Sequence, residues 1–224
     1  MDTAQLSKAG ILFIILLCSL ALHEFGHAWM ADKRGDPLPR QQGRVTLDPT
    51  AHLDPIGSFL IPGIMILTSV FSSGMPFALL GWGKPVQISL PNRDTRRLDD
   101  ILITLAGPGV NLLLALVFSI AAGLFYAHGD TNAVNRFFTP AIRLNVTLAV
   151  FNLVPIPPLD GSHLLRHAIG MSDEIYFRLA ANGWWVLLIL INVSFFRELL
   201  STAIYASATP FFHIANFVTQ LFGT

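Results

Sequence analysis

The sequence is poor in charged residues and almost without cysteine. Asp, Glu, Lys and Arg make up 12% of its 224 residues, whereas ordinary soluble domains carry about 25%. A single cysteine excludes a framework of intramolecular disulfides. Fourteen acidic side chains balance fourteen basic ones, so the net charge offers no electrostatic basis for binding nucleic acid. With 53% hydrophobic residues, the chain is expected to lie in a lipid bilayer as one membrane-embedded domain, residues 1–224.

Long apolar runs predict an all-α polytopic membrane protein with about five apolar helical segments. The first run ends near Met30 and begins with a stretch of signal-peptide length, but no small-residue cleavage site follows, so we expect a retained helix over 9–30. The segment 58–80 is broken by prolines and glycines, and the tail 210–224 is expected to lie at the membrane interface. The remaining apolar runs cover 101–127, 141–154 and 184–205.

Two polar loops predict the orientation of the chain. The segments 31–57 and 81–97 each carry four Lys or Arg residues, and basic loops favour the cytoplasmic side. A simple crossing by 58–80 would put these loops on opposite sides. We therefore expect 58–80 to form a re-entrant hairpin, with an ordinary kinked span as the alternative. The chain is then a multi-pass protein of the cell membrane (plasma or inner membrane), with its polar motifs toward the cytoplasm.

The most informative pattern is His23-Glu24-Phe25-Gly26-His27, at the end of the first apolar run. Helical residues four apart lie on one face, so both imidazoles can point at one metal ion. The neighbouring carboxylate of Glu24 can hold a metal-bound water. Because charged and metal-binding groups are costly in lipid, their presence there favours a function. The alternative is a pair of helix-facing histidines that bond to the backbone or to neighbouring groups.

A catalytic zinc site usually takes a third protein ligand, and Asp160 is the best-placed candidate. It follows several prolines that interrupt the apolar run 141–154, so its carboxylate can turn inward. Glu198, in the last apolar run, has a neighbouring arginine with which it can pair instead. Because Asp-Gly-Ser is also turn chemistry, a helix cap at the membrane surface explains Asp160 as well as a metal ligand does.

Together these motifs resemble those of the site-2 protease family of intramembrane zinc metalloproteases, in a short form without appended PDZ or CBS domains. The resemblance rests on the histidine motif at 23–27, on Ala-Gly-Pro-Gly-Val-Asn at 106–111, and on Asn-Leu-Val-Pro-Ile-Pro-Pro-Leu-Asp-Gly at 152–161. The motifs at 23–27 and 152–161 are specific in combination, and 106–111 resembles a further element of the family on the helix between them. The resemblance covers most of the chain, from Ala9 to about His167.

The resemblance implies an enzyme that hydrolyses peptide bonds in or next to the transmembrane segments of protein or peptide substrates. His23, His27 and Asp160 would bind one Zn²⁺ per chain. Glu24 would be the general base that accepts a proton from the zinc-bound water. Asn152 would donate a hydrogen bond to the oxyanion or to the substrate backbone; the alternative is an interhelical hydrogen bond that holds the helices together.

Other polar residues carry weaker signals. Asn111 is expected to bond to a neighbouring helix, and His163 and His167 either support the metal site or lie exposed in a loop. The β-branched stretch 42–49 predicts a short β-hairpin after the first helix. Its free edge would offer a place where an unwound substrate segment adds as a strand.

Two other functions are compatible with intramembrane His and Asp residues. A transporter or channel would use them for protons or metal ions, but it needs no glutamate beside the histidine, and the sequence has no inverted repeat. A catalytically inactive scaffold is the second alternative, although every residue that the family's chemistry requires is present.

Overall fold

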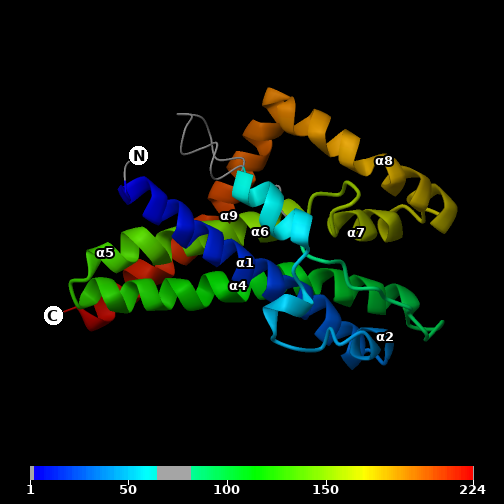
Figure 1. Cartoon of the computed structure of the whole chain (residues 1–224), viewed down its shortest axis with the longest axis horizontal. Helices are drawn as coiled ribbons and strands as arrows, with labels where there is room; N and C mark the ends of the chain where they lie inside the picture. Colours follow the sequence, from blue (N-terminus) through cyan, green and yellow to red (C-terminus); the bar gives the residue numbers. More distant parts are fainter. Residues whose placement is uncertain (1–2, 65–81, 224) are drawn as a thin grey trace.

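A computed structural model describes residues 3–64 and 82–223, which are mostly helical (Figure 1). These residues contain no β-strand, so the prediction of an all-α protein is confirmed. In chain order the elements are α1 (Thr3–Lys33), α2 (Leu38–Gln41), the 3-10 helix η1 (Pro49–Ala51), the π-helix η2 (Pro55–Leu60), α4 (Arg96–Ala127), α5 (Thr131–Ala133), the π-helix η3 (Val134–Phe138), α6 (Thr139–Asn152), α7 (Gly161–Ala168), α8 (Asp173–Asn192) and α9 (Ser194–Phe222).

Helix α4 is the centre of the fold, and α1, α6 and α9 pack against it (Figure 1). A second set of contacts joins α1 to α6 through aliphatic side chains that are at most 5% exposed: Ile15, Leu16, Leu20, Ala141, Leu144 and Leu148. Small residues such as Ala115 and Ala208 let α4, α6 and α9 approach closely. Close packing of this kind holds membrane helices together, because lipid tails are as apolar as the side chains themselves.

Three helices within the described residues are long and apolar enough to cross a bilayer: Gln5–Lys33 in α1, α4 and α8. Helix α6 is not among them, although α5, η3 and α6 follow one another without a break over 131–152. The expectation of about five apolar spanning segments is not supported by this part of the chain.

The expected span over 184–205 is interrupted. Helix α8 ends at Asn192, Val193 is extended (φ −80°, ψ 122°), and α9 begins at Ser194. The Asn192 side chain donates back to the carbonyl oxygen of Leu188 (2.8 Å). Asparagine side chains compete for backbone groups, and β-branched valine favours extended backbone, so this Asn-Val pair ends the helix.

The expectation that the tail 210–224 lies at the membrane interface stays a prediction. The described residues of the tail, up to Phe222, form the second half of α9 and pack on α4. A Cβ at Gly123 would lie 2.6 Å from Val218 Cβ, so the missing side chain is what allows the two helices to touch. Thr219 Oγ1 donates to the carbonyl oxygen of Gly123 (3.2 Å), and the contact buries Val218.

The predicted β-hairpin over 42–49 is wrong, because this loop is built from turns and bends. Side chains rather than a strand ladder satisfy its backbone: Arg44 donates to the carbonyl oxygen of Ala51, and His52 Nε2–H donates to that of Thr46 (2.8 Å). Such local side-chain bonds compete with sheet formation. The free edge expected for substrate binding is therefore not found at 42–49.

The two basic loops lie side by side. Ser89 Oγ donates to Asp36 Oδ1 (2.6 Å), and the backbone N–H of Lys84 donates to the carbonyl oxygen of His52 (2.7 Å). Most of the segment predicted to be re-entrant, 58–80, lies outside the described residues. Of that segment, residues 58–64 are helical.

Candidate metal centre

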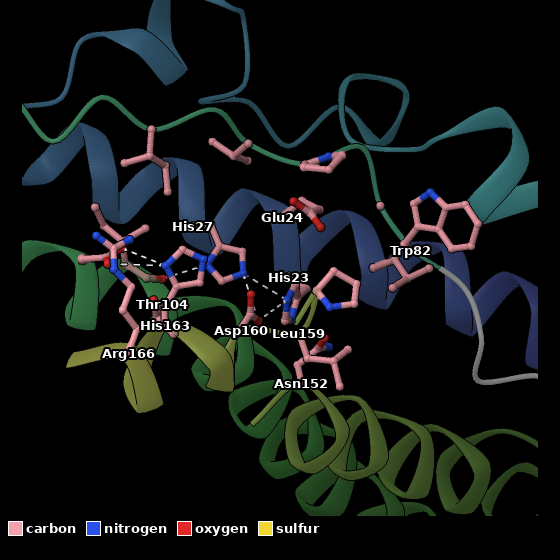
Figure 2. Close-up of a pocket in the computed structure, with 18 of the residues that line it drawn as sticks. His23, Glu24, His27, Trp82, Thr104, Asn152, Leu159, Asp160, His163 and Arg166 are labelled. Carbon is pink, nitrogen blue, oxygen red and sulfur yellow. Dashed lines mark hydrogen bonds and ion pairs between the residues drawn. The ribbon is translucent and has the colours of Figure 1, made fainter. Parts of the chain in front are cut away.

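Three of the predicted site residues meet between α1 and the start of α7 (Figure 2). Asp160 Oδ2 lies 3.1 Å from His23 Nε2 and 3.3 Å from His27 Nε2, and the two Nε2 atoms are 3.1 Å apart. Both histidines are buried and Asp160 is partly buried. The fold thus brings together ligand-type atoms from two distant parts of the chain, and we refer to these residues as the metal triad.

The hydrogen bonds of the two imidazoles decide which nitrogens face the centre of the triad. His23 Nδ1–H donates to Asn111 Oδ1 (2.6 Å), and His27 Nδ1–H donates to the carbonyl oxygen of Ile103 (2.7 Å). Each Nε2 therefore points a lone pair toward the Asp160 carboxylate. Three acceptors this close repel one another unless a proton or a metal ion lies between them. Their separations agree with the roughly 3.3 Å edge of a tetrahedral site whose ligand bonds are about 2.0 Å.

Two glycines allow the histidine face of α1 to lie directly on α4. A Cβ at Gly26 would lie 2.9 Å from the carbonyl oxygen of Ala106. A Cβ at Gly107 would overlap the His27 ring and lie 2.8 Å from His23 Cε1. Because neither glycine has a side chain, the two imidazoles pack directly against the backbone of α4.

Gly107→Ala is expected to displace both imidazoles and to weaken metal binding, because the new methyl group needs the space of the His27 ring. We expect metal affinity to fall by about 10- to 100-fold, the range found when groups that orient metal-binding histidines are removed. Competition with a chromophoric chelator measures the affinity. Gly109→Ala is the matched control on the same helix, since a Cβ there meets no atom within 4 Å. Equal affinities in the two variants would contradict this interpretation.

Asp160 reaches the histidines because the chain turns between two helices. Helix α6 ends at Asn152, and α7 begins at Gly161. As predicted, the proline-rich stretch between them does not continue the helix. Gly161 lies so close to the carbonyl group of Leu153 that a Cβ would overlap it. This tight turn places Asp160 at the head of α7, facing α1.

A buried carboxylate that sequence reasoning missed holds α7 against α4. Asp100 of α4 is 4% exposed, and it accepts hydrogen bonds from His167 Nε2–H (2.6 Å) and His163 Nδ1–H (3.4 Å). The two histidines are four residues apart and so share one face of α7. Both histidines have Asp100 as an acidic partner. This favours the expectation that they support the metal site over the alternative that they lie exposed in a loop. The four-residue spacing of His163 and His167 is the signal in the sequence, because it indicates that the two side chains share a partner.

Glu24 lies beside the triad beneath a segment without helix or strand, Trp82–Leu90, which we call the strap (Figure 2). A Cβ at Gly83 would lie 2.7 Å from Glu24 Oε1, so the backbone of the strap touches the side chain. Toward its far end the strap is held by Asp36, which accepts from the N–H and the Oγ–H of Ser89 (2.6 Å each). Burial tends to raise the pKa of Asp36, but these hydrogen bonds keep it below its ordinary value.

The triad, Glu24 and the strap line a cavity of about 530 Å³ (Figure 2). At one side the indole rings of Trp82 and Trp184 contact each other, with centroids 4.9 Å apart and ring planes tilted by 55°. The lining also includes an apolar group (Leu20, Phe151, Leu159) and a polar group (Arg96, Asp100, His163, Arg166). The cavity therefore offers both apolar and polar contacts next to the triad.

Asn152, the last residue of α6, also lines this cavity. Its Nδ2–H donates to the carbonyl oxygen of Leu148 (3.0 Å), one turn earlier in its own helix. The structure thus places Asn152 at the cavity with the triad, with one of its two Nδ2–H groups engaged within α6. Its role toward a substrate stays a prediction.

Comparisons with known proteins agree with this geometry. The model of peptidase family M50 matches residues 125–194. YwhC of Bacillus subtilis, named as a zinc metalloprotease, is 35% identical over 170 residues, which cover 73% of this chain and 71% of YwhC. The chain belongs to peptidase family M50. Two proteins called Rip2 and named as zinc metalloproteases are M50 relatives as well. Rip2 of Mycolicibacterium smegmatis is 32% identical (85% of this chain, 70% of Rip2), and Rip2 of Mycobacterium tuberculosis is 36% identical (71% and 59%).

Membership of family M50 confirms the resemblance to the site-2 proteases and the prediction of a metalloprotease. The region matched by the M50 model contains Asn152 and Asp160 but not the histidine motif. No solved structure matches the chain.

Proposed function

We propose that this M50 peptidase is an intramembrane zinc endopeptidase that hydrolyses peptide bonds in or next to transmembrane segments. The observation that carries the proposal is the convergence of three acceptor atoms, from His23, His27 and Asp160, beside Glu24 in one cavity. Two imidazoles and a carboxylate are a donor set that suits zinc. The names of the M50 relatives support the same metal.

Glu24 is the proton carrier in the proposed reaction. Zinc bound by the triad would supply Lewis acidity, which brings the pKa of a coordinated water toward about 7. Glu24 would accept a proton from a water molecule whose oxygen attacks the carbonyl carbon of the substrate. The C–N bond of the peptide then breaks, and Glu24 returns its proton to the departing amine. The carboxylate is regenerated, and one water is consumed for each bond cut.

Asn152 is the proposed partner of the oxyanion. Its amide faces the cavity next to the triad, within reach of a peptide that lies along it. The bond to Leu148 uses one of the two Nδ2–H groups, and the second can donate to the oxygen that gains charge during attack. A hydrogen bond that forms only at that stage lowers the barrier without tightening substrate binding.

The composition of the cavity supports a membrane-spanning substrate. A helix hides its own carbonyl groups, so the substrate must unwind before one of them reaches Glu24. The indole rings of Trp82 and Trp184 suit the apolar part of such a segment, and Arg96 and Arg166 suit its polar flank. The contact between the two basic loops supports an active site near the cytoplasmic surface.

Removal of the metal tests this proposal. The purified chain, reconstituted in vesicles, is treated with a chelator, and cleavage is followed on peptides with and without a transmembrane segment. We expect cleavage of membrane-spanning peptides to disappear and to return on addition of one Zn²⁺ per chain. Cleavage that survives complete metal removal, or that is confined to soluble peptides, would contradict the proposal.

A further inference from the structure

A chain of hydrogen bonds connects the metal triad to the backbone of α6. Asn111 Oδ1 of α4 accepts from His23 Nδ1–H (2.6 Å), and Asn111 Nδ2–H donates to Asn145 Oδ1 of α6 (3.0 Å). Asn145 Nδ2–H in turn donates to the carbonyl oxygen of Ala141, one turn earlier (2.9 Å). His23 is 3% exposed, and both asparagines are fully buried. We call Asn111 and Asn145 the amide relay.

Helix packing alone does not account for the amide relay. Burying an amide among apolar helices is unfavourable unless its donors and acceptors are paired. Leucine has the same branching at Cγ and, as an apolar side chain, would pack among the helices without that requirement. The two asparagines are paired with each other, and the far end of the pair contacts a metal-binding residue. This arrangement indicates a role at the metal site.

The backbone determines the direction of the hydrogen bonds in the relay. A carbonyl oxygen only accepts, so Asn145 must turn its NH₂ group toward Ala141 and its Oδ1 toward Asn111. Asn111 must then turn its own NH₂ group toward Asn145. The carbonyl oxygen of Ser19, 3.4 Å from Asn111 Nδ2, requires the same orientation. Asn111 Oδ1 is left facing His23, whose Nδ1 must therefore carry the proton.

We propose that Asn111 and Asn145 are positioning residues that hold His23 in the tautomer able to bind the metal. With the proton on Nδ1, the Nε2 lone pair is free for the ion. A reversed Asn111 amide would present its NH₂ group to Nδ1, shift the ring proton to Nε2 and block the ligand atom. This inference rests on the metal site of the proposed function, but it does not depend on peptide cleavage.

His27 provides a contrast within the same site. Its Nδ1–H donates to the backbone carbonyl oxygen of Ile103 (2.7 Å), a partner that no side-chain substitution removes. The orientation of His23 depends on the relay, whereas that of His27 does not. Breaking the relay should therefore weaken one ligand of the triad and leave the other two in place.

The test is the zinc affinity of the whole chain, measured by competition with a chromophoric chelator. Asn111→Leu removes the acceptor of His23 and is expected to lower the affinity by about 10- to 100-fold. Asn145→Leu leaves Asn111 present but free to reverse, and is expected to lower it by about tenfold. Ser119→Ala is the matched control, because this hydroxyl is equally buried in α4 and donates to Ala115 of the same helix (2.7 Å).

A second variant and a spectroscopic measurement distinguish the loss of the relay from a general folding defect. Asn111→Asp keeps an acceptor for His23 and should retain more zinc affinity than Asn111→Leu. In NMR spectra of zinc-loaded protein with ¹⁵N-labelled histidine, the Nδ1–H signal of His23 should shift in the relay variants, while that of His27 stays in place. Shifts of both signals alike would indicate a general disturbance and overturn the proposal.

The outcomes separate this inference from the proposed function. Unchanged zinc affinity in Asn111→Leu, or an equal loss in Ser119→Ala, would overturn the relay. Unchanged affinity in Asn145→Leu would overturn the part of the proposal that concerns Asn145. A chain that shows the expected affinities but cleaves no peptide would refute the endopeptidase proposal and leave the relay standing.

Discussion

Glu24→Gln is expected to abolish peptide cleavage while zinc stays bound. Glutamine preserves the size of the side chain but accepts no proton from water. The contribution of the general base, typically 10²- to 10⁴-fold in rate, is therefore lost. The metal triad is untouched, so the zinc content should remain at one ion per chain. Cleavage of a membrane-spanning peptide and metal content are measured on the same preparation.

Glu198→Gln is the control for this experiment. It makes the same chemical change on α9, at an exposed glutamate that does not line the cavity, and should leave both activity and zinc content unchanged. Full cleavage by Glu24→Gln would refute its assignment as general base. Loss of zinc in that variant would mean that Glu24 is itself a ligand, and the roles of the site residues would have to be reassigned.

Asp160→Ala is expected to abolish stable zinc binding and, with it, all cleavage. The substitution removes the anionic member of the triad, whose Oδ2 lies within 3.3 Å of both Nε2 atoms. Two imidazoles on one helix then remain, which is one ligand fewer than a catalytic zinc normally has. Zinc affinity should fall by more than about 100-fold, beyond the usual effect of residues that only orient a ligand. Metal analysis after dialysis against a mild chelator measures the loss.

The fold should survive this substitution. The Asp160 side chain makes no capping hydrogen bond to α7, and Asp100 still holds His163 and His167. Circular dichroism of the purified variant should therefore show unchanged helix content. Asp94→Ala, at an exposed carboxylate before α4, is expected to retain zinc. Normal zinc retention by Asp160→Ala would show that another group is the third ligand.

The two helices that carry most of the site were predictable from local pattern. The apolar runs at 9–30 and 101–127 correspond to α1 and α4. A helix in a bilayer satisfies its own backbone hydrogen bonds, so length and composition are enough to predict it. The spacing of His23 and His27 is equally local, because residues four apart share a face in any helix.

The failure of the predicted β-hairpin over 42–49 has a physical cause. The outcome there depends on partners that the local pattern does not contain. Arg44 folds its loop by donating to the distant carbonyl oxygen of Lys84 (3.4 Å) as well as to that of Ala51. The tail packs on α4 because Gly123 leaves room for it. Neither partner is visible within a window of one helix or one strand.

Local sequence is enough to place two imidazoles and the Glu24 carboxylate together at one end of an apolar helix, because helical periodicity is a local property of the chain. How the site is supported depends on the packing of the helices. Asn111, Asn145 and Asp100 act on residues from other helices, and these contacts exist because glycines such as Gly107 let α1 and α4 approach closely. Contacts of this kind depend on how whole helices pack, and no spacing within a single segment predicts them.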